Sequence, residues 1–337
     1  MPNPTSTFVL DIGRHCNINC KFCYYHHLGD LRKQGWKTEE SIINEITDGV
    51  GRGNTRVEVT GGEPTLYQLM PYFVKMMKNK GLEVCIITNG LVSKERLREL
   101  IYSGVDEFLI SIHGTEKIHD ELTMHGAREL QELALDVIDR SGLKNGYRFN
   151  FVINSFNQLN IYEAAQWMSQ WQPTIVNFIN MNPHGMWQNS KDTKSVIADL
   201  RIVETQLDAA IKHLESSLID VNLRYYPMCR VAEKYRRCVC NDLHVMFDPK
   251  EWDYCTMPKT FERYKQWGID TSNNVEEKGE PCCRCDLQWV CGGVNKHFHK
   301  ASNEMFGELI LPQKTWDVDK NDFYHYRKDC FFEKEVV

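Results

Sequence analysis

Three cysteines lie within eight residues in the stretch RHCNINCKFCY, which covers residues 14–24. It follows an apolar run at residues 7–12 that we expect to be the first strand, so the cysteines fall in a loop at the carboxyl end of that strand. Ligands bind at this edge of parallel sheets. The spacing C-x3-C-x2-C offers three thiolates to a [4Fe–4S] cluster, which normally takes four. One iron then keeps an open coordination position, as in metal sites that do chemistry.

The composition narrows the class of protein. The chain has 337 residues, a net charge of -6 and 13 cysteines, and its length predicts about two domains. It contains neither an apolar run long enough for a membrane helix nor a secretory signal, so we expect a cytoplasmic protein with no membrane contact. The acidic balance argues against a nucleic-acid partner. Disulfides are uncommon in the cytosol and 13 is an odd number, so we interpret the cysteines as metal ligands.

Around this loop, short β-rich runs alternate with helical patterns up to about residue 220. We predict strands at residues 7–12, 56–60, 82–88, 107–112, 147–153 and 174–179, and helices near residues 38–50, 66–80, 93–103, 127–141, 160–170 and 195–218. Thr38 and Ser93 are expected to cap two of these helices. Strands that alternate with helices predict a parallel sheet, and six units are too few for a closed eightfold barrel. The prediction is an α/β partial (β/α)6 TIM-like barrel over residues 1–220, followed by a cysteine-rich domain over residues 221–337.

More than the cysteines links this pattern to a known family. An aromatic residue, Phe22, precedes the third cysteine, and the second predicted strand runs into the sequence TGGEP at residues 60–64. With the C-x3-C-x2-C loop, these features resemble the radical S-adenosylmethionine (radical SAM) enzymes. The resemblance implies that Cys16, Cys20 and Cys23 hold a [4Fe–4S] cluster. It also implies that S-adenosylmethionine contacts the following residues: Phe22, Gly61, Gly62, Glu63, Asn89, Ser111 and His113.

The resemblance also implies a reaction. In this family, the open iron binds S-adenosylmethionine, and an electron from the cluster cleaves the sulfonium to give a 5′-deoxyadenosyl radical that abstracts hydrogen from an unactivated carbon. An external reductant such as flavodoxin or ferredoxin is then a required partner. We expect a peptide or protein substrate, with a sugar or aminocyclitol as the alternative. Oxidation, epimerisation and cross-linking stay open, and the sequence names no catalytic residue beyond the cofactor site.

The second cysteine region resembles the SPASM and twitch domains of certain radical SAM enzymes, which hold auxiliary clusters. By this resemblance Cys282, Cys285, Cys291 and Cys330 form an outer cluster, and Cys240 and Cys255 belong to an inner one that Cys229 or Cys238 completes. Asn295 stands where the family pattern has a cysteine, so the number of auxiliary clusters, one or two, stays open. The competing interpretation is a non-enzymatic structural zinc protein, because four thiolates also make a closed zinc site.

Overall fold

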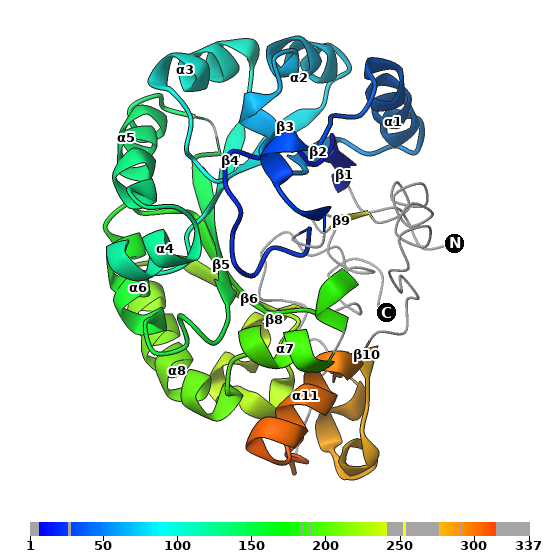
Figure 1. Ribbon diagram of the computed structural model, residues 1–337, viewed down its shortest axis with the longest axis vertical. Helices are drawn as coiled ribbons and strands as arrows, with labels where there is room; N and C mark the ends of the chain where they lie inside the picture. The colour runs from blue at the N-terminus through cyan, green and yellow to red at the C-terminus, as the bar shows by residue number, and fades with distance from the viewer. Residues whose placement is uncertain are drawn as a thin grey trace, which may run out of the picture.

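One curved parallel sheet organises the molecule (Figure 1). The computed structural model describes residues 7–25, 28–143, 145–183, 185–188, 190–240, 252–253, 276–289 and 291–314. The sheet has the strand order β8-β7-β6-β5-β4-β3-β2-β1-β9, and neighbouring strands in it are parallel. Its strands are β1 (Thr7–Asp11), β2 (Arg56–Thr60), β3 (Glu83–Thr88), β4 (Glu107–Ser111), β5 (Tyr147–Ile153), β6 (Ile175–Asn180), β7 (Asp220–Arg224), β8 (Val239–Cys240) and β9 (Trp252–Asp253).

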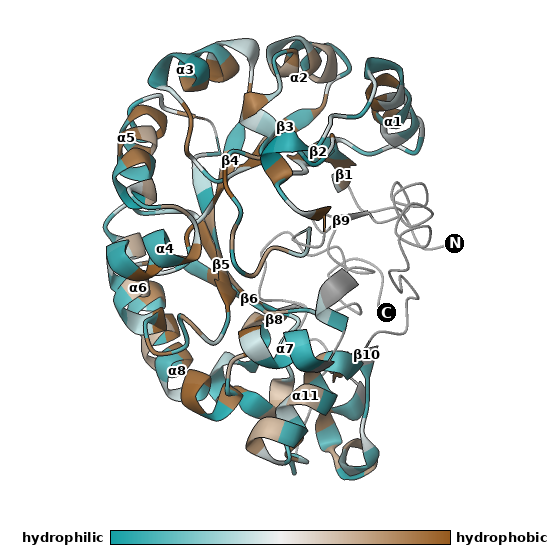
Figure 2. Ribbon diagram, in the orientation of Figure 1, coloured by the Kyte–Doolittle hydropathy of each residue, from teal (hydrophilic) through white to brown (hydrophobic). Residues whose placement is uncertain are grey.

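Helices cover the convex side of this sheet (Figure 1). They are α1 (Glu39–Gly51), α2 (Met70–Asn79), α3 (Lys94–Ser103), α4 (Glu116–Leu122), α5 (Ala127–Asp139), α6 (Ile161–Ser169) and α8 (Leu200–Ser216). Two further helices, α7 (Ser190–Val196) and α11 (Lys296–Phe306), pack on each other outside this convex layer. In Figure 2 the outer helices are banded in brown and teal, as expected when one face of each packs on the sheet. Alternate strand residues such as Val57, Phe108 and Phe178 are fully buried in that layer. Burial of this apolar face provides the main driving force for the fold.

The opposite, concave face of the sheet carries two groups of polar side chains. Near its amino-terminal end, Arg148 pairs with Glu58 at 2.5 Å and with Glu107 at 2.8 Å. Two residues further along β5 is Asn150. It lies in register with Asn177 on β6 and Asn222 on β7. Their side chains form a ladder, in which Asn222 donates to Asn177 at 2.8 Å and Asn177 donates to Asn150 at 2.9 Å. These hydrogen bonds satisfy polar groups that would otherwise be costly to bury.

The predicted α/β partial barrel is confirmed, with some differences in detail. Thr38 and Ser93 accept hydrogen bonds from backbone N–H groups at the start of α1 and α3, as capping residues do. The single helix predicted at residues 195–218 is two helices, because Asp199 caps α8 and interrupts the helical pattern. The sequence did not predict α4 or β7. A two-stranded antiparallel ribbon, β10 (Glu276–Glu277) with β11 (Val294–Asn295), precedes α11.

Among the helices that the structure describes, none combines the length and the apolar character needed to cross a bilayer.

Candidate active site

The loop after β1 carries Cys16, Cys20 and Cys23 into the concave side of the half-barrel (Figure 1). Asp11, the last residue of β1, fixes the start of this loop: it accepts hydrogen bonds from the Gly13 backbone at 3.0 Å and from Arg14 at 2.5 Å. Because Asp11 is buried, this pairing with Arg14 compensates the cost of its charge. The route of the loop is therefore set before its first cysteine.

The three thiols share one buried space. Burial raises the pKa of Cys16 to about 12 and the pKa of Cys23 to about 11. The pKa of Cys20 is raised by burial and then by the nearby thiols of Cys23 and Cys16. Three thiolates cannot coexist in such a space without a compensating positive charge, and a bound metal supplies one.

The spacing of these thiols favours a cluster over a single metal ion. Ligand atoms around one tetrahedral zinc lie about 3.8 Å apart, given a zinc–sulfur distance near 2.3 Å. In the described part of the chain, three such atoms within 4.8 Å of one another occur at Glu58, Cys85 and Glu107, and not among the three loop cysteines. The three loop thiols are thus not gathered as closely as ligands around one zinc ion, and three thiolate donors suit three corners of a [4Fe–4S] cluster.

The glycines at positions 61 and 62 let the turn after β2 lie directly against the cysteine loop. The backbone N–H of Gly62 donates to the Gly13 carbonyl at 2.9 Å, and that of Glu63 donates to the His15 carbonyl at 2.8 Å. A Cβ atom on Gly61 would lie 2.6 Å from the Gly13 oxygen, and one on Gly62 would overlap the His15 carbonyl. Gly61 also has a φ of 141°, which side-chain-bearing residues rarely adopt. Glycine is required at both positions by this close approach.

Glu63 ties this turn to the end of β3. Its carboxylate accepts hydrogen bonds from the Thr65 backbone at 3.0 Å, the Thr88 hydroxyl at 2.8 Å and the Asn89 backbone at 2.6 Å. Burial raises the pKa of Glu63, and these hydrogen bonds oppose the rise. The side chain of Asn89 donates to Asn17 at 2.8 Å and lies 3.8 Å from the Cys16 sulfur. The two segments that the sequence singled out thus meet the cysteine loop.

Phe22 and His113 form the opposite wall of the site. Their ring centroids are 4.6 Å apart in an edge-to-face arrangement. The backbone N–H of Val152 donates to Nδ1 of His113 at 3.2 Å, so the hydrogen of a neutral ring lies on Nε2. Burial lowers the pKa of His113 to about 3, which keeps the ring neutral at physiological pH. Ser111 lies on the same wall, in register with Asn150 of the asparagine ladder.

A second group of cysteines forms around the β10–β11 ribbon. Cys229, Cys282, Cys285 and Cys291 line one small cavity. The pKa of Cys229 is raised by burial and by the neighbouring thiols of Cys291 and Cys282. Backbone N–H groups point at these sulfurs: Gln313 donates to Cys285 at 3.3 Å, and Leu311 and Met228 donate to Cys229 and Cys291. Donors aimed at sulfur stabilise the thiolate form that binds metal.

The other cysteines of the predicted auxiliary sites lie elsewhere or outside the described residues. Cys238 is fully buried in the hydrophobic core. Cys240 ends β8, but its side chain is outside the described part, as are Cys255 and Cys330. Asn295 has a structural role at its position: its oxygen accepts from the backbone of His297 and Phe298 at the start of α11, and its amide donates to Asn182 at 2.6 Å.

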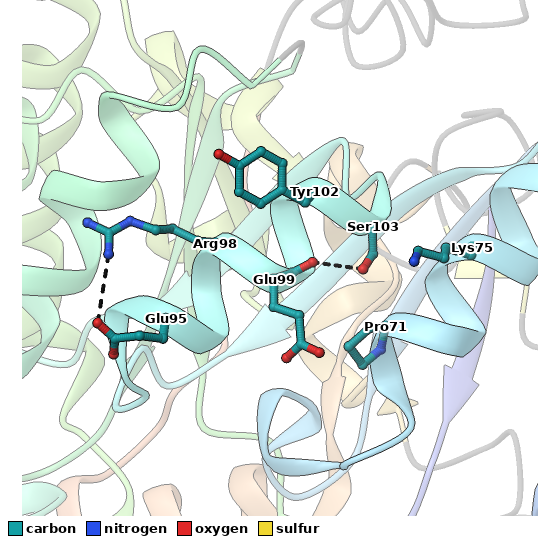
Figure 3. Close-up of a pocket in the computed structure, with 7 residues that line it drawn as sticks. All are labelled: Pro71, Lys75, Glu95, Arg98, Glu99, Tyr102 and Ser103. Carbon is teal, nitrogen blue, oxygen red and sulfur yellow. Dashed lines mark hydrogen bonds and ion pairs between the residues drawn. The ribbon is translucent and has the colours of Figure 1, made fainter.

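A shallow depression of about 460 Å³ lies between α2 and α3, on the outer side of the molecule (Figure 3). It is lined by Pro71, Lys75, Glu95, Arg98, Glu99, Tyr102 and Ser103. Two ion pairs, Glu95 with Arg98 and Arg96 with Glu99, neutralise most of its charge. No cysteine lines it, so we do not assign the reaction to it.

Sequence reasoning missed three features of this site. These are the loop contacts of Asp11, the contact of Trp187 with the cysteine loop, and the asparagine ladder. Part of the signal for the ladder was present, since asparagine occurs at positions 150 and 177 on two predicted strands, whereas position 222 lies beyond the last predicted strand. Its meaning depends on strand register, which one sequence does not fix.

Comparisons with known proteins agree with this geometry. Residues 10–168 match the family model of the radical SAM superfamily. A probable GTP 3′,8-cyclase from Sulfolobus acidocaldarius is 28% identical over 189 residues, which cover 55% of this chain and 59% of that protein. SuiB of Streptococcus suis, solved with S-adenosylmethionine, aligns with a TM-score of 0.58 and 15% identity over 88% of this chain and 74% of SuiB. Native anSMEcpe with bound AdoMet aligns with a TM-score of 0.56 and 14% identity over 97% of this chain and 96% of that one.

The matches differ in how much of each relative they cover and in what they establish. The chain spans about three fifths of the length of the cyclase, and the two solved structures, at such low identity, establish a shared fold alone. Radical SAM enzymes use S-adenosylmethionine and a [4Fe–4S] cluster, and the donor set and spacing of the cysteine loop fit such a cluster. The half-barrel, the three-cysteine loop and the family match together identify residues 10–168 of this chain as a domain of the radical SAM superfamily.

Proposed function

We propose that this protein is an enzyme that reductively cleaves S-adenosylmethionine and abstracts a hydrogen atom from an unactivated carbon of a small polar molecule. The observation that carries the proposal is the packing of three buried thiols beside the Gly61–Gly62 turn, on the concave side of the half-barrel. When bound, the cluster and S-adenosylmethionine supply a 5′-deoxyadenosyl radical, and the protein contributes orientation and exclusion of water. An electron donor such as flavodoxin or ferredoxin completes the reaction.

The residues of this chain have distinct roles in the proposal. Cys16, Cys20 and Cys23 hold the cluster, and Asn89 lies beside the Cys16 sulfur, where a donor adjusts the electronic properties of the iron. Glu63, through its hydrogen bonds, keeps the Gly-Gly turn and the end of β3 in one arrangement for the methionine part of the cofactor. Contacts to adenosine are assigned to the opposite wall, which consists of Phe22, Ser111 and His113.

The second cysteine group is proposed as an auxiliary metal site with the ligands Cys229, Cys282, Cys285 and Cys291. Four thiols around one cavity match a [4Fe–4S] cluster with every iron bound by the protein. Such a closed site suits electron transfer or structural support, and not substrate binding. This proposed ligand set has Cys229 in place of Cys330, which the sequence predicts as a ligand and which lies outside the described residues. A further cluster at Cys240, Cys255 and Cys238 stays a prediction.

Two observations favour a small polar substrate over a peptide. The asparagine ladder on the concave face begins at Asn150, which is half-buried and in register with Ser111 of the cofactor wall, so the sheet surface next to the site is polar. The curated relative named above is a GTP 3′,8-cyclase by name, and GTP is not a peptide. Peptide substrates, which the sequence placed first, are the second candidate and an outcome of the test below.

A fractionation experiment tests this substrate class. Reconstituted protein is supplied with S-adenosylmethionine and dithionite, and 5′-deoxyadenosine is measured after addition of GTP, of a cell extract filtered below about 3 kDa, or of the retained protein fraction treated or not treated with protease. We expect the filtrate to increase 5′-deoxyadenosine formation at least several-fold. Stimulation by the retained fraction alone, lost after protease treatment, would establish the peptide candidate instead.

The close approach at Gly62 gives a second test. Alanine at this position would force the His15 carbonyl, and with it the cysteine loop, away from the turn. We expect Gly62→Ala to lose about four irons per chain and the cleavage of S-adenosylmethionine. Gly51→Ala is the matched control, because Gly51 lies in α1 with nothing within 4 Å of a new Cβ. Full iron content in Gly62→Ala would contradict the role of the turn.

A further inference from the structure

A segment after β6, residues 181–183, 185–188 and 190–196, lies against the cysteine loop. We call it the strap. Its Trp187 is almost completely buried, and the indole N–H donates to the backbone carbonyl of Cys23 at 3.1 Å. Met181, Trp187 and Val196 of the strap pack in one apolar cluster with Phe22 and Leu122. The strap therefore contacts the cysteine loop both through the backbone of Cys23 and through the side chain before it.

The other side of the strap is attached to α11. Asn182 accepts a hydrogen bond from the Asn295 amide at 2.6 Å, and Lys194 pairs with Glu304 at 2.7 Å. Figure 1 shows α7, which belongs to the strap, beside α11. Asn295 is buried, so its hydrogen bond to Asn182 is sheltered from competing water. The ion pair is more exposed and contributes less.

The start of α11 is in turn tied to the second cysteine group. Asn295 follows Cys291 by four residues, and the residues between them include Gly293, whose backbone N–H points at the Cys291 sulfur. Asn295 also pairs with Glu276 across the β10–β11 ribbon. A metal bound to Cys291 would fix this short segment, because the sulfur could no longer move independently of the ribbon.

We propose that Asn295 and Trp187 are positioning residues that make the arrangement of the first cysteine loop depend on occupancy of the second metal site. The path runs from Cys291 to Asn295, from Asn295 to Asn182, and through the strap to the Cys23 carbonyl. The family pattern has a cysteine at position 295. The asparagine of this chain instead provides a hydrogen bond that joins the start of α11 to the strap. The inference rests on the proposed function, since it requires both metal sites.

The test measures backbone amide exchange at residues 20–25 in iron-reconstituted protein. Trp187→Phe keeps an aromatic ring but removes the indole N–H. Asn295→Ser keeps an oxygen that caps α11 but is too short to reach Asn182. Loss of one such hydrogen bond is expected to raise exchange at residues 20–25 about fivefold in each variant, and Cys291→Ala should have the same effect. The low-temperature EPR spectrum of the reduced first cluster with S-adenosylmethionine should shift in the same three variants.

Trp167→Phe is the matched control. Trp167 lies on α6 and donates its indole N–H to Glu132 at 3.3 Å, away from the strap, so exchange at residues 20–25 should match that of wild type. The inference is overturned if Asn295→Ser and Cys291→Ala exchange faster in α11 but at the wild-type rate in residues 20–25. Wild-type protein that takes up no iron would overturn the proposed function instead, so the two failures are distinct.

Discussion

Alanine in place of Cys16, Cys20 or Cys23 is expected to abolish formation of 5′-deoxyadenosine and to remove about four irons per chain. Each thiol would hold one corner of the first cluster, and three polar side chains of the loop, Asn17, Asn19 and Asp30, are already joined by hydrogen bonds to other groups. A cluster held by two thiolates would also expose more iron to water and be lost. The loss should therefore be complete in each variant and not graded.

Cys283→Ser is the control for this series. Cys283 is an exposed cysteine between two proposed ligands of the second site, and its replacement tests whether removal of any thiol near a cluster is harmful. Iron content and cleavage should stay at the wild-type level. The proposed function would be abandoned if the three alanine variants still formed 5′-deoxyadenosine, or if the wild-type protein bound one or two zinc ions and no iron.

The half-barrel could be predicted from sequence because its strands are apolar on the side that the helices cover. Tyr147–Ile153 shows the limit of that signal: its buried residues alternate with Arg148, Asn150 and Val152, which face the concave side. The strand β7 was missed for a related reason. It begins at Asp220, and only Val221 and Leu223 among its residues are apolar, so little apolar pattern marks it. The helix α4 has seven residues, too few to show a helical period.

The first site was predictable because its residues are close in sequence or follow consecutive strands. Parallel topology brings the carboxyl ends of β1, β2, β3 and β4 to one edge, so residues after these strands must meet. The second site does not have this property. Cys229 and Cys282 are far apart in the sequence, and no periodic pattern relates their positions. Only the folded structure shows that both cysteines line one cavity.

The ligands of the second site can be decided with three variants. We expect Cys229→Ala to lose about four irons per chain while cleavage of S-adenosylmethionine continues, now uncoupled from product formation. The reason is that Cys229 lines the same cavity as Cys282, Cys285 and Cys291, and its pKa is raised by two of those thiols. The first cluster keeps its own three ligands, so reductive cleavage is retained. Iron analysis and the ratio of 5′-deoxyadenosine to product provide the measurements.

The matched variants are Cys238→Ala and Cys330→Ala. Cys238 is fully buried in the apolar core, so its replacement should lower the urea midpoint of unfolding but leave the iron content unchanged. If Cys330 is the fourth ligand, as the family pattern implies, Cys330→Ala loses the irons and Cys229→Ala keeps them. Loss of iron in Cys229→Ala alone would instead mean that Cys229, which precedes the β10–β11 ribbon in the sequence, is the fourth ligand of the auxiliary site. One metal group would then join the connection between β10 and β11 to the segment around Cys229, and such a link stabilises a ribbon whose two strands have only two residues each.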